Sequence, residues 1–419
     1  MSKNLNTMSY KKIFPIVFSL LIIASACTKN NPVDETPSDI EMSQKSAKIV
    51  ESDNQFGMEL FKKINAADTE GKNIMISPLS VSLALAMAYN GAEGDTKEQM
   101  EIMLHKLNLT PDEINQSYKT LVNALKSHDV KVALEIANAI FYHQDFSVKN
   151  DFLNINKEYY DAEVKALDFG NSKNTLETIN GWVSDKTHEK IESILDVISP
   201  NDVMVLVNAV YFNGEWTYRF EKDNTADRVF FYEDGSNKNV PTMMIKEKFS
   251  YYEHSQFEML ELPYGGGKYS MLVFLPKEGI TVNQTIGLLS PENISSWIGQ
   301  MQSWEKKVFL PKFEFKYDNS LNDELQALGM VDAFLPAKAN FKGITEAQQI
   351  FISEVMHKSY IKVDERGTEA AAVTGITFET TSAGPNDIFA VDHPFAFAIK
   401  EKDTNAILFI GKVLDPKQD

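Results

Sequence analysis

The sequence predicts one large domain of mixed α and β structure, and three observations indicate this fold class. Of the 419 residues, 43% are hydrophobic and 11% are aromatic, which is ample for an extensive buried core. Helical periodicity dominates the first part of the chain, while strand-like apolar runs dominate the later part. Between residue 47 and residue 419 there is neither an internal repeat nor a second linker, so we expect these elements to share one domain.

The individual elements follow from the spacing of apolar residues. Residues 49–66 carry the spacing of an amphipathic helix, and residues 80–89 are densely apolar. Residues 132–142 alternate as a half-buried strand does, while residues 203–212 form an apolar run typical of a strand, with Asn208 as its polar residue. Further strands are expected at residues 269–275, 393–399 and 406–413.

The first 26 residues have the pattern of a bacterial export signal. Three lysines precede an apolar stretch at residues 13–23, and small residues at 24–26 lead directly to Cys27, the single cysteine of the chain. This arrangement resembles the lipobox of bacterial lipoproteins, in which that cysteine is acylated, although Ala24 stands where leucine is usual. We therefore expect export and lipid anchoring through Cys27, in the outer membrane with a periplasmic or cell-surface orientation. Ordinary cleavage without lipidation would instead give a secreted protein.

Residues 27–46 have the composition of a tether. They contain no aromatic residue and almost no large apolar residue, so they cannot bury much surface. We expect the lipidated cysteine and a flexible tether at residues 27–46, and the compact body at residues 47–419.

Charge and motifs exclude several classes of function. The formal charge of −18 argues against nucleic acid or anionic lipid as the main partner. The chain has no G-x-S-x-G elbow, no phosphate-binding loop and no dinucleotide fingerprint, and its histidines lack metal-ligand spacing. We expect no catalysis, no cofactor and no metal, although a Ser/His/Asp triad that meets only in space would leave no such signal.

Two polar residues lie within apolar strands. Asn208 interrupts the run 203–212, and His357 precedes the alternating residues 360–363. A buried amide or imidazole destabilises the fold unless it finds hydrogen-bond partners. The two side chains either form hydrogen bonds within the core without any special function or belong to a functional site. The pattern alone leaves both interpretations open.

Residues 364–390 combine the features of a strand and of a loop. Alternate residues from Thr368 to Thr380 form one face without any charge, which a sheet could bury. Small residues at 370–372 and the turn at residues 384–387 suit an exposed connection instead. The segment is compatible with both states.

Several motifs together resemble the serpin family, from about residue 47 to residue 416. Residues 73–80 (NIMISPLS) resemble its first signature, and residues 207–216 (VNAVYFNGEW) resemble a strand of its main sheet. Residues 364–372 (DERGTEAAA) are similar to the proximal hinge of inhibitory members. Residues 389–395 (FAVDHPF) and 409–413 (FIGKV) are similar to its C-terminal signature and final strand, with Ala396 where a larger residue is usual.

The resemblance implies three β-sheets surrounded by helices, with residues 366 to about 388 as an exposed reactive-centre loop. It implies a breach that contains Trp216, and a shutter, which is a hydrogen-bonded cluster under the point where the main sheet opens. The shutter residues would be Ser77, Ser80, Asn208 and His357. The hinge residues would be Glu365, Gly367, Thr368, Ala370, Ala371 and Ala372.

The resemblance also implies a mechanism, suicide-substrate trapping by a monomeric inhibitor. A protease would cleave the loop near Thr381-Ser382, and the cut loop would insert into the main sheet before the acyl-enzyme is hydrolysed. Since no lysine or arginine lies between Arg366 and Lys400, trypsin-like targets are disfavoured. The small residues around the proposed bond favour elastase-like or subtilisin-like targets. Two alternatives stay open: a non-inhibitory serpin with a carrier, storage or chaperone role, and a cross-class inhibitor of papain-like proteases.

Overall fold

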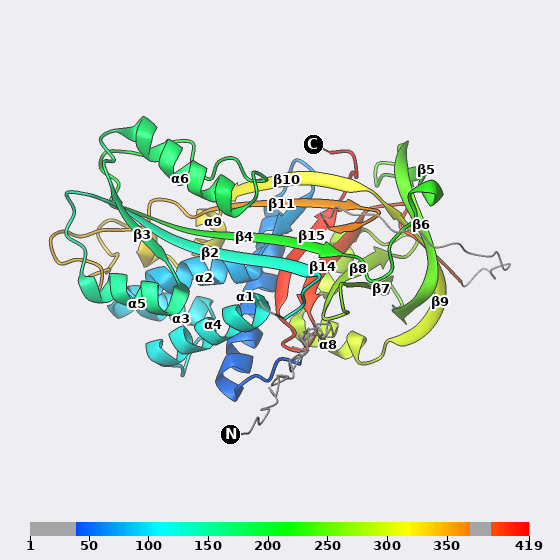
Figure 1. Cartoon of the computed structure of the whole chain (residues 1–419), viewed down its shortest axis with the longest axis horizontal. Helices are drawn as coiled ribbons and strands as arrows, with labels where there is room; N and C mark the ends of the chain where they lie inside the picture. The colour runs from blue at the N-terminus through cyan, green and yellow to red at the C-terminus, as the bar shows by residue number, and fades with distance from the viewer. Residues whose placement is uncertain (1–38, 127, 369–386, 419) are drawn as a thin grey trace, which may run out of the picture. The chain divides into compact units, whose positions relative to one another are not determined.

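The computed structural model describes residues 39–126, 128–368 and 387–418, and Figure 1 shows their arrangement. Its α-helices are α1 (Gln44–Ala67), α2 (Pro78–Tyr89), α3 (Gly94–Met103), α4 (Pro111–Lys126), α5 (Asn150–Tyr160), α6 (Ser172–Lys186), α7 (Val282–Leu288), α8 (Pro291–Ile298) and α9 (Asn322–Ala327). Two short 3₁₀ helices, η1 (Lys222–Asn224) and η2 (Asp332–Phe334), lie in connections. The helices expected at residues 49–66 and 80–89 are confirmed as α1 and α2.

The strands form two hydrogen-bonded sheets within the described residues. The six-stranded sheet has the order β10 (Phe313–Ser320), β11 (Met356–Asp364), β12 (Gly367–Thr368), β4 (Met204–Glu215), β2 (Val132–His143) and β3 (Glu163–Leu167). The nine-stranded sheet has the order β1 (Ile74–Ile76), β15 (Ile407–Val413), β14 (Phe395–Glu401), β8 (Tyr269–Pro276), β7 (Phe257–Tyr264), β6 (Asn237–Glu253), β9 (Gln302–Pro311) and β13 (Ile388–Ala390), while β5 (Ala226–Phe231) also pairs with β6. All five predicted strands are present, with ends shifted by a few residues.

The long strand β6 explains why two sheets appear where three were expected. Its first residues pair with β5, and its last residues pair with β7. Along most of its length it also pairs with β9. β6 therefore joins two groups of strands into one continuous sheet. One group contains β5, β9 and β13, and the other contains β7, β8, β14, β15 and β1.

Helix α2 is buried because its sequence is apolar on every side. Ser77 caps its first turn by accepting a hydrogen bond from the Ser80 backbone N–H, and Pro78 occupies the first helical position. The helix packs against β4 and β15, so it lies beneath the six-stranded sheet. This places Ser77 and Ser80 under the centre of that sheet.

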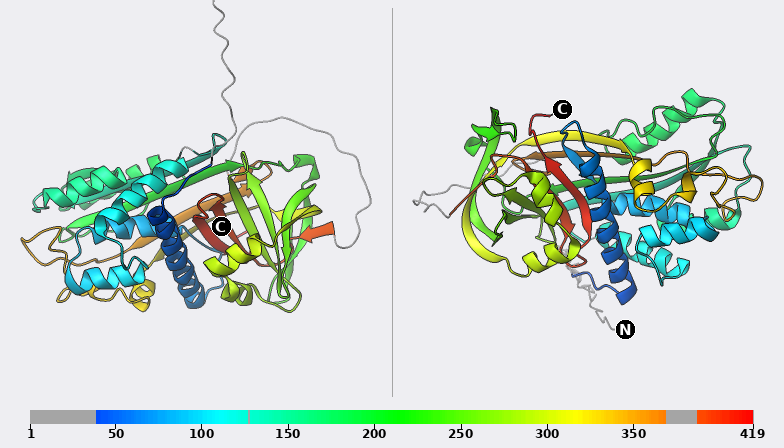
Figure 2. Two further views of the ribbon diagram at one scale, coloured as in Figure 1. Left: turned by 90° about the horizontal axis from the view of Figure 1, so that it is seen from below. Right: turned by 180° about the vertical axis from the view of Figure 1, so that it is seen from behind.

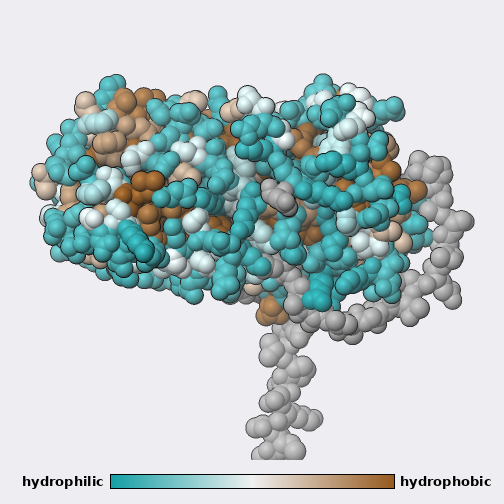
Figure 3. Space-filling model, turned by 90° about the horizontal axis from the view of Figure 1, so that it is seen from above, coloured by the Kyte–Doolittle hydropathy of each residue, from teal (hydrophilic) through white to brown (hydrophobic). Residues whose placement is uncertain are grey.

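The outer face of the six-stranded sheet carries a second, smaller core. Residues of α6 and of the following connection, including Ile179, Val183 and Ile191, pack there against Val207 of β4. Figure 2 shows α6 lying along this sheet. The apolar run 203–212 thus has a packing partner on each face. The face seen in Figure 3 is otherwise mostly hydrophilic, with separate apolar patches.

The body begins slightly before the expected boundary at residue 47. Helix α1 starts at Gln44, and the Ile40 backbone N–H donates to Asp403 Oδ2 at 2.9 Å. The last residues of the expected tether are therefore part of the folded body.

Candidate functional site

An open seam runs through the middle of the six-stranded sheet, between β4 and β11. At the end of the seam that lies near Gly214, which we call its upper end, the two-residue strand β12 pairs antiparallel with both neighbours. Thr368 lies opposite Gly214 on one side and Val363 on the other. Below Thr368, β4 pairs only with β2 and β11 only with β10 in the described part of the chain. We call the region between residues 204–212 and 356–361, where β4 and β11 do not pair with each other, the slot.

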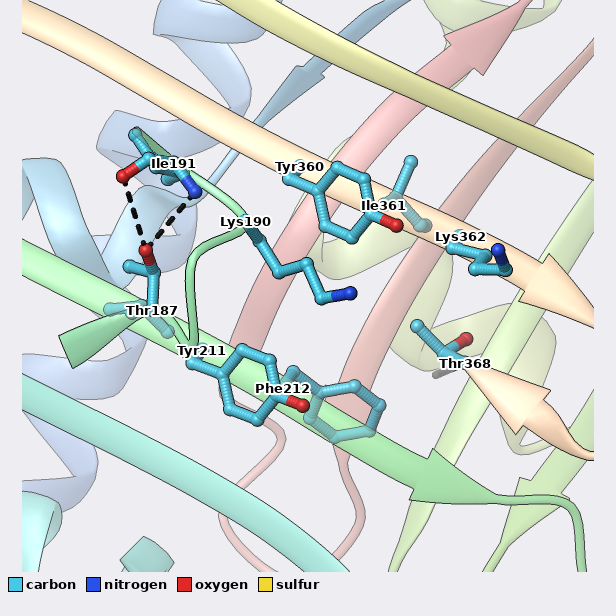
Figure 4. A pocket seen from close by; sticks show the side chains of 10 residues that line it. Thr187, Lys190, Ile191, Tyr211, Phe212, Tyr360, Ile361, Lys362 and Thr368 are labelled. Atoms are coloured by element: carbon cyan, nitrogen blue, oxygen red, sulfur yellow. Dashed lines mark hydrogen bonds between the residues drawn. The ribbon is translucent and has the colours of Figure 1, made fainter. Parts of the chain in front are cut away.

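Among the described residues, side chains rather than a strand line the slot. Just below Thr368, Figure 4 shows Tyr211 and Phe212 of β4 across from Tyr360 and Ile361 of β11. Further down, a cavity of about 370 Å³ lies between β4, β11 and α2. The main-chain groups along both edges could therefore form ladder hydrogen bonds with one added strand.

The connection between α6 and β4 covers the slot from outside. Lys190 Nζ lies 5.5 Å from the centre of the Tyr360 ring on β11. The His188 ring lies 4.4 Å from that of Tyr211 on β4. This connection therefore touches both edges of the slot without filling it.

The upper end of the slot holds the predicted hinge and breach residues together. Trp216 is buried and stacks on Tyr264, with ring centres 4.4 Å apart. Its indole N–H donates to the Asp364 carbonyl at 3.0 Å, and its backbone N–H donates to the Arg366 carbonyl at 2.8 Å. The Tyr264 hydroxyl lies 2.7 Å from the Thr368 hydroxyl in a buried hydrogen bond.

The hinge differs from the expectation of an exposed loop beginning at residue 366. Gly367 and Thr368 are buried, Thr368 being only 4% exposed, because β12 is already a strand of the sheet. A Cβ atom on Gly367 would lie 2.0 Å from the Gly214 carbonyl oxygen, so only glycine fits at this position. The hinge therefore begins inside the sheet.

Glu365 anchors the chain just before the hinge. Its carboxylate accepts hydrogen bonds from Lys312 Nζ at 2.9 and 3.1 Å and from the Thr225 hydroxyl at 2.9 Å. Burial by itself would raise the pKa of Glu365, but these hydrogen bonds outweigh it and hold that pKa below its ordinary value. The carboxylate is therefore ionised at neutral pH and ties β11 to the neighbouring strands.

The predicted shutter residues lie around the lower slot, although not as one closed cluster. The Ser77 backbone N–H donates to His357 Nε2 at 3.2 Å. Nearby, the Ser359 hydroxyl donates to the Met75 carbonyl at 2.7 Å. Burial lowers the pKa of His357 to about 4, so its ring is neutral at physiological pH and Nε2 is available as an acceptor.

Asn208 lies on the other side of the cavity and has a partner that sequence reasoning missed. Its amide donates to Asn138 Oδ1 at 2.7 Å, and the Asn138 amide in turn donates to the Tyr160 carbonyl at 2.7 Å. Asn208 Oδ1 is buried without a hydrogen-bond partner and belongs to a residue that lines the cavity. Asn138 was visible as a polar residue among the apolar positions of residues 132–140, but its partner could not be read from that pattern.

The remaining predicted site residues lie outside the described residues. These are Cys27, Ala370, Ala371, Ala372, Thr381 and Ser382. Within the described residues, no helix combines the length and the apolar character needed to cross a membrane.

A comparison with protein families matches residues 51–416 to the serpins, described as serine protease inhibitors. The chain belongs to the serpin family. A serpin-like protein of Methanosarcina acetivorans is 38% identical over 384 residues, which cover 88% of this chain and 87% of that protein. Members of the family generally act as protease inhibitors rather than as catalysts.

Solved serpin structures share the fold. The thermophilic serpin tengpin in its native state has a TM-score of 0.80 at 36% identity, covering 90% of this serpin and 96% of that chain. Thyroxine-binding globulin in complex with thyroxine has the same TM-score at 30% identity, covering 88% and 100%.

Proposed function

We propose that this serpin inhibits endopeptidases by suicide-substrate trapping, with the slot as the receiving site for its own cleaved loop. The observation that carries this proposal is β12, a strand of only two residues that lies between β4 and β11 and is antiparallel to both. The chain that follows Thr368 can extend this strand downward without reversing direction. The slot offers unpaired edges of β4 and β11 over the length that such an extension needs.

The register of β12 assigns a position to each inserted residue. Thr368 lies opposite Gly214 and Val363, so an antiparallel extension brings Ala370 opposite Phe212 and Ile361. By the same counting, Ala372 comes opposite Val210 and Ser359. The residues that pass first into the buried face are therefore small, which lets the sheet accept them with little steric cost.

Thr374 reaches the shutter in this register, opposite Asn208 and His357. Asn208 Oδ1 has no hydrogen-bond partner while the slot is open. A threonine hydroxyl arriving there can donate to it, and leaving such a buried acceptor unsatisfied costs about 1–3 kcal/mol. Insertion would thus resolve an unfavourable feature of the open slot.

The cover over the slot must move for insertion, and its polar contacts with the sheet are weak. Glu192 and Lys316 form an ion pair at 3.3 Å with both side chains exposed. His188 Nε2 likewise lies 3.0 Å from Glu135 Oε1 on β2, and about half of each side chain is exposed. Exposed ion pairs of this kind contribute about 0–1 kcal/mol each. These contacts would therefore oppose an entering strand only weakly.

The loop sequence supports an elastase-like or subtilisin-like serine protease as the target. Small residues surround the proposed scissile bond Thr381-Ser382, and the loop after Arg366 offers no basic residue to a trypsin-like pocket. Phe378 keeps a papain-like target as the alternative. We further propose that Cys27 is lipidated and anchors the inhibitor to the bacterial membrane through the tether.

The test is to mix the purified protein with a panel of these proteases and analyse the mixture on denaturing gels. We expect an SDS-stable covalent complex with at least one elastase-like or subtilisin-like enzyme. Thr368→Arg should convert the protein into a substrate, because it places a charge on the buried face of β12. Glu369→Arg is the matched control: it adds the same side chain to the opposite face and should still form the complex.

A non-inhibitory role would give a different result. If every protease leaves the protein intact or cuts the loop without a covalent adduct, the inhibitory proposal is wrong. A carrier role would then be the next candidate, since thyroxine-binding globulin shares this fold and binds a small molecule. The hinge of small residues argues for the inhibitor.

A further inference from the structure

Three ligand-type side chains converge away from the slot, at the turn between β14 and β15. Nε2 of His128, which precedes β2, lies 3.2 Å from Glu401 Oε1 and 3.3 Å from Asp403 Oδ2. One possible ligand atom from each of the three residues lies within 4.8 Å of those from the other two. Glu401 is fully buried and the His128 side chain is only 1% exposed, whereas Asp403 is partly exposed.

His128 Nε2 is buried and forms no hydrogen bond with either carboxylate, although both oxygens are near. At distances of 3.2 and 3.3 Å, neither oxygen therefore meets the geometry of a hydrogen bond from a ring N–H. On a tetrahedral zinc ion with bonds of about 2.0–2.1 Å, neighbouring ligand atoms lie about 3.3 Å apart. Both nitrogen–oxygen distances match that value, so the imidazole and carboxylates flank a position that a metal ion would fill.

The surrounding hydrogen bonds hold both carboxylates in place. Glu401 Oε1 accepts from the Asp403 backbone N–H, and Oε2 accepts from the backbone N–H and hydroxyl of Thr404. Asp403 Oδ2 accepts from the Ile40 N–H and from Lys268 Nζ at 2.8 Å. Lys268 Nζ also reaches Oδ1 of the same carboxylate at 3.1 Å, so it can keep that contact while Oδ2 binds a metal.

The charges also favour a cation at this place. Lys268 forms a second ion pair with Asp39, so its charge is shared between two carboxylates. Glu401 has no lysine or arginine within ion-pair distance among the described residues. With His128 as a neutral ligand, the charge of one divalent cation balances the charges of Glu401 and Asp403. Lys268 then balances the charge of Asp39.

We propose that His128 Nε2, Glu401 Oε1 and Asp403 Oδ2 form a binding site for one divalent cation, with zinc as the ion that best suits this donor set. Three protein ligands leave the fourth position of a tetrahedral ion for water, on the exposed side of Asp403. The ion would join the segment before β2 to the β14–β15 turn and, through Asp403, to Ile40 before α1. The site would therefore stabilise the native body at the point where the tether enters it.

The experiment uses the full-length chain after treatment with a chelator. Isothermal titration with Zn²⁺ should show one equivalent bound per chain, and Co²⁺ should give the visible absorption of tetrahedral coordination. Free zinc at about a hundred times the dissociation constant should raise the melting temperature by several degrees. His128→Gln and Asp403→Asn should each abolish the binding and the shift, and Asp403→Asn keeps the shape of the side chain if His128→Gln folds poorly.

A matched control separates this site from a simple histidine–carboxylate pair. His105 lies 3.0 Å from Glu59 alone, so His105→Gln should leave zinc binding unchanged. Zinc binding that survives in both site variants would overturn the proposal. So would a wild-type protein that binds no zinc at any concentration tested.

Discussion

Replacing Gly367 by alanine tests whether the hinge must sit inside the sheet before the protease arrives. The added Cβ would lie 2.0 Å from the Gly214 carbonyl oxygen and 2.8 Å from the Glu215 Cα. Both contacts are with the backbone of β4, which cannot turn away as a flexible side chain would. We expect the mutation to expel β12 from between β4 and β11 rather than to move the long strand β4.

The magnitude follows from the contacts that β12 makes. Expulsion removes the pairing of Gly367 and Thr368 with both neighbouring strands and separates the Thr368 and Tyr264 hydroxyls. Each ladder hydrogen bond contributes about 0.5–1.5 kcal/mol and an unsatisfied buried hydroxyl costs about 1–3 kcal/mol, so the loss is roughly 3–5 kcal/mol. Insertion would also have to start from an expelled hinge, so a larger share of the inhibitor should be consumed as substrate.

The assay compares urea unfolding and the stoichiometry of inhibition for the wild type and the variant. Gly181→Ala is the matched control, because a Cβ atom on Gly181 in α6 would meet no neighbouring atom and should be neutral or slightly stabilising. Trp216, stacked on Tyr264 beneath the hinge, reports expulsion through its fluorescence. A Gly367→Ala protein with wild-type stability and wild-type stoichiometry would refute the reasoning.

The slot, the shutter and the export signal give three further predictions. Nicking the loop between residues 374 and 383 should raise the melting temperature by tens of degrees, since the inserted strand adds roughly 10 kcal/mol of ladder hydrogen bonds; a cleaved form that melts no higher would exclude insertion. His357 has a folded-state pKa of about 4, below its ordinary 6.5, so its contribution to stability is complete above pH 6.5 and is lost as the pH falls toward 4. The loss should reach about 3 kcal/mol in urea unfolding, and His357→Gln should flatten this pH dependence; an equal slope in both proteins would contradict it. Cys27→Ala should abolish labelling by radioactive fatty acid and release the protein from washed membranes, where its retention would show that another feature anchors it.

The sequence allowed the fold class and most elements to be predicted because their signals are local. The dense helix at residues 80–89 reflects burial on every side, and α2 is buried in this way, while β4 at residues 203–212 has buried and partly buried residues along its length. Asn208 and His357 stood out for the same reason, as polar groups in apolar strands. Their partners did not, because Asn138 and Ser77 lie in distant segments that meet them only after folding.

The hinge shows the same division between local pattern and tertiary contact. Its small residues and its uncharged face at residues 368–380 were evident from alternation along the chain, which left strand and loop equally possible. Thr368 is buried because it fits into the space between β4 and β11 and hydrogen-bonds to the Tyr264 hydroxyl. Neither feature can be recognised in the sequence around residue 368.

By itself, then, the sequence determined the family, the order of the elements and the residues suited to a hinge and a shutter, since these depend on composition and short-range spacing. Only the tertiary structure decided which edges of the sheet stay unpaired, where Asn208 Oδ1 lacks a partner, and how His128 meets Glu401 and Asp403. The physical reason is that hydrogen bonds and ion pairs between distant segments depend on three-dimensional distance, which no local periodicity encodes.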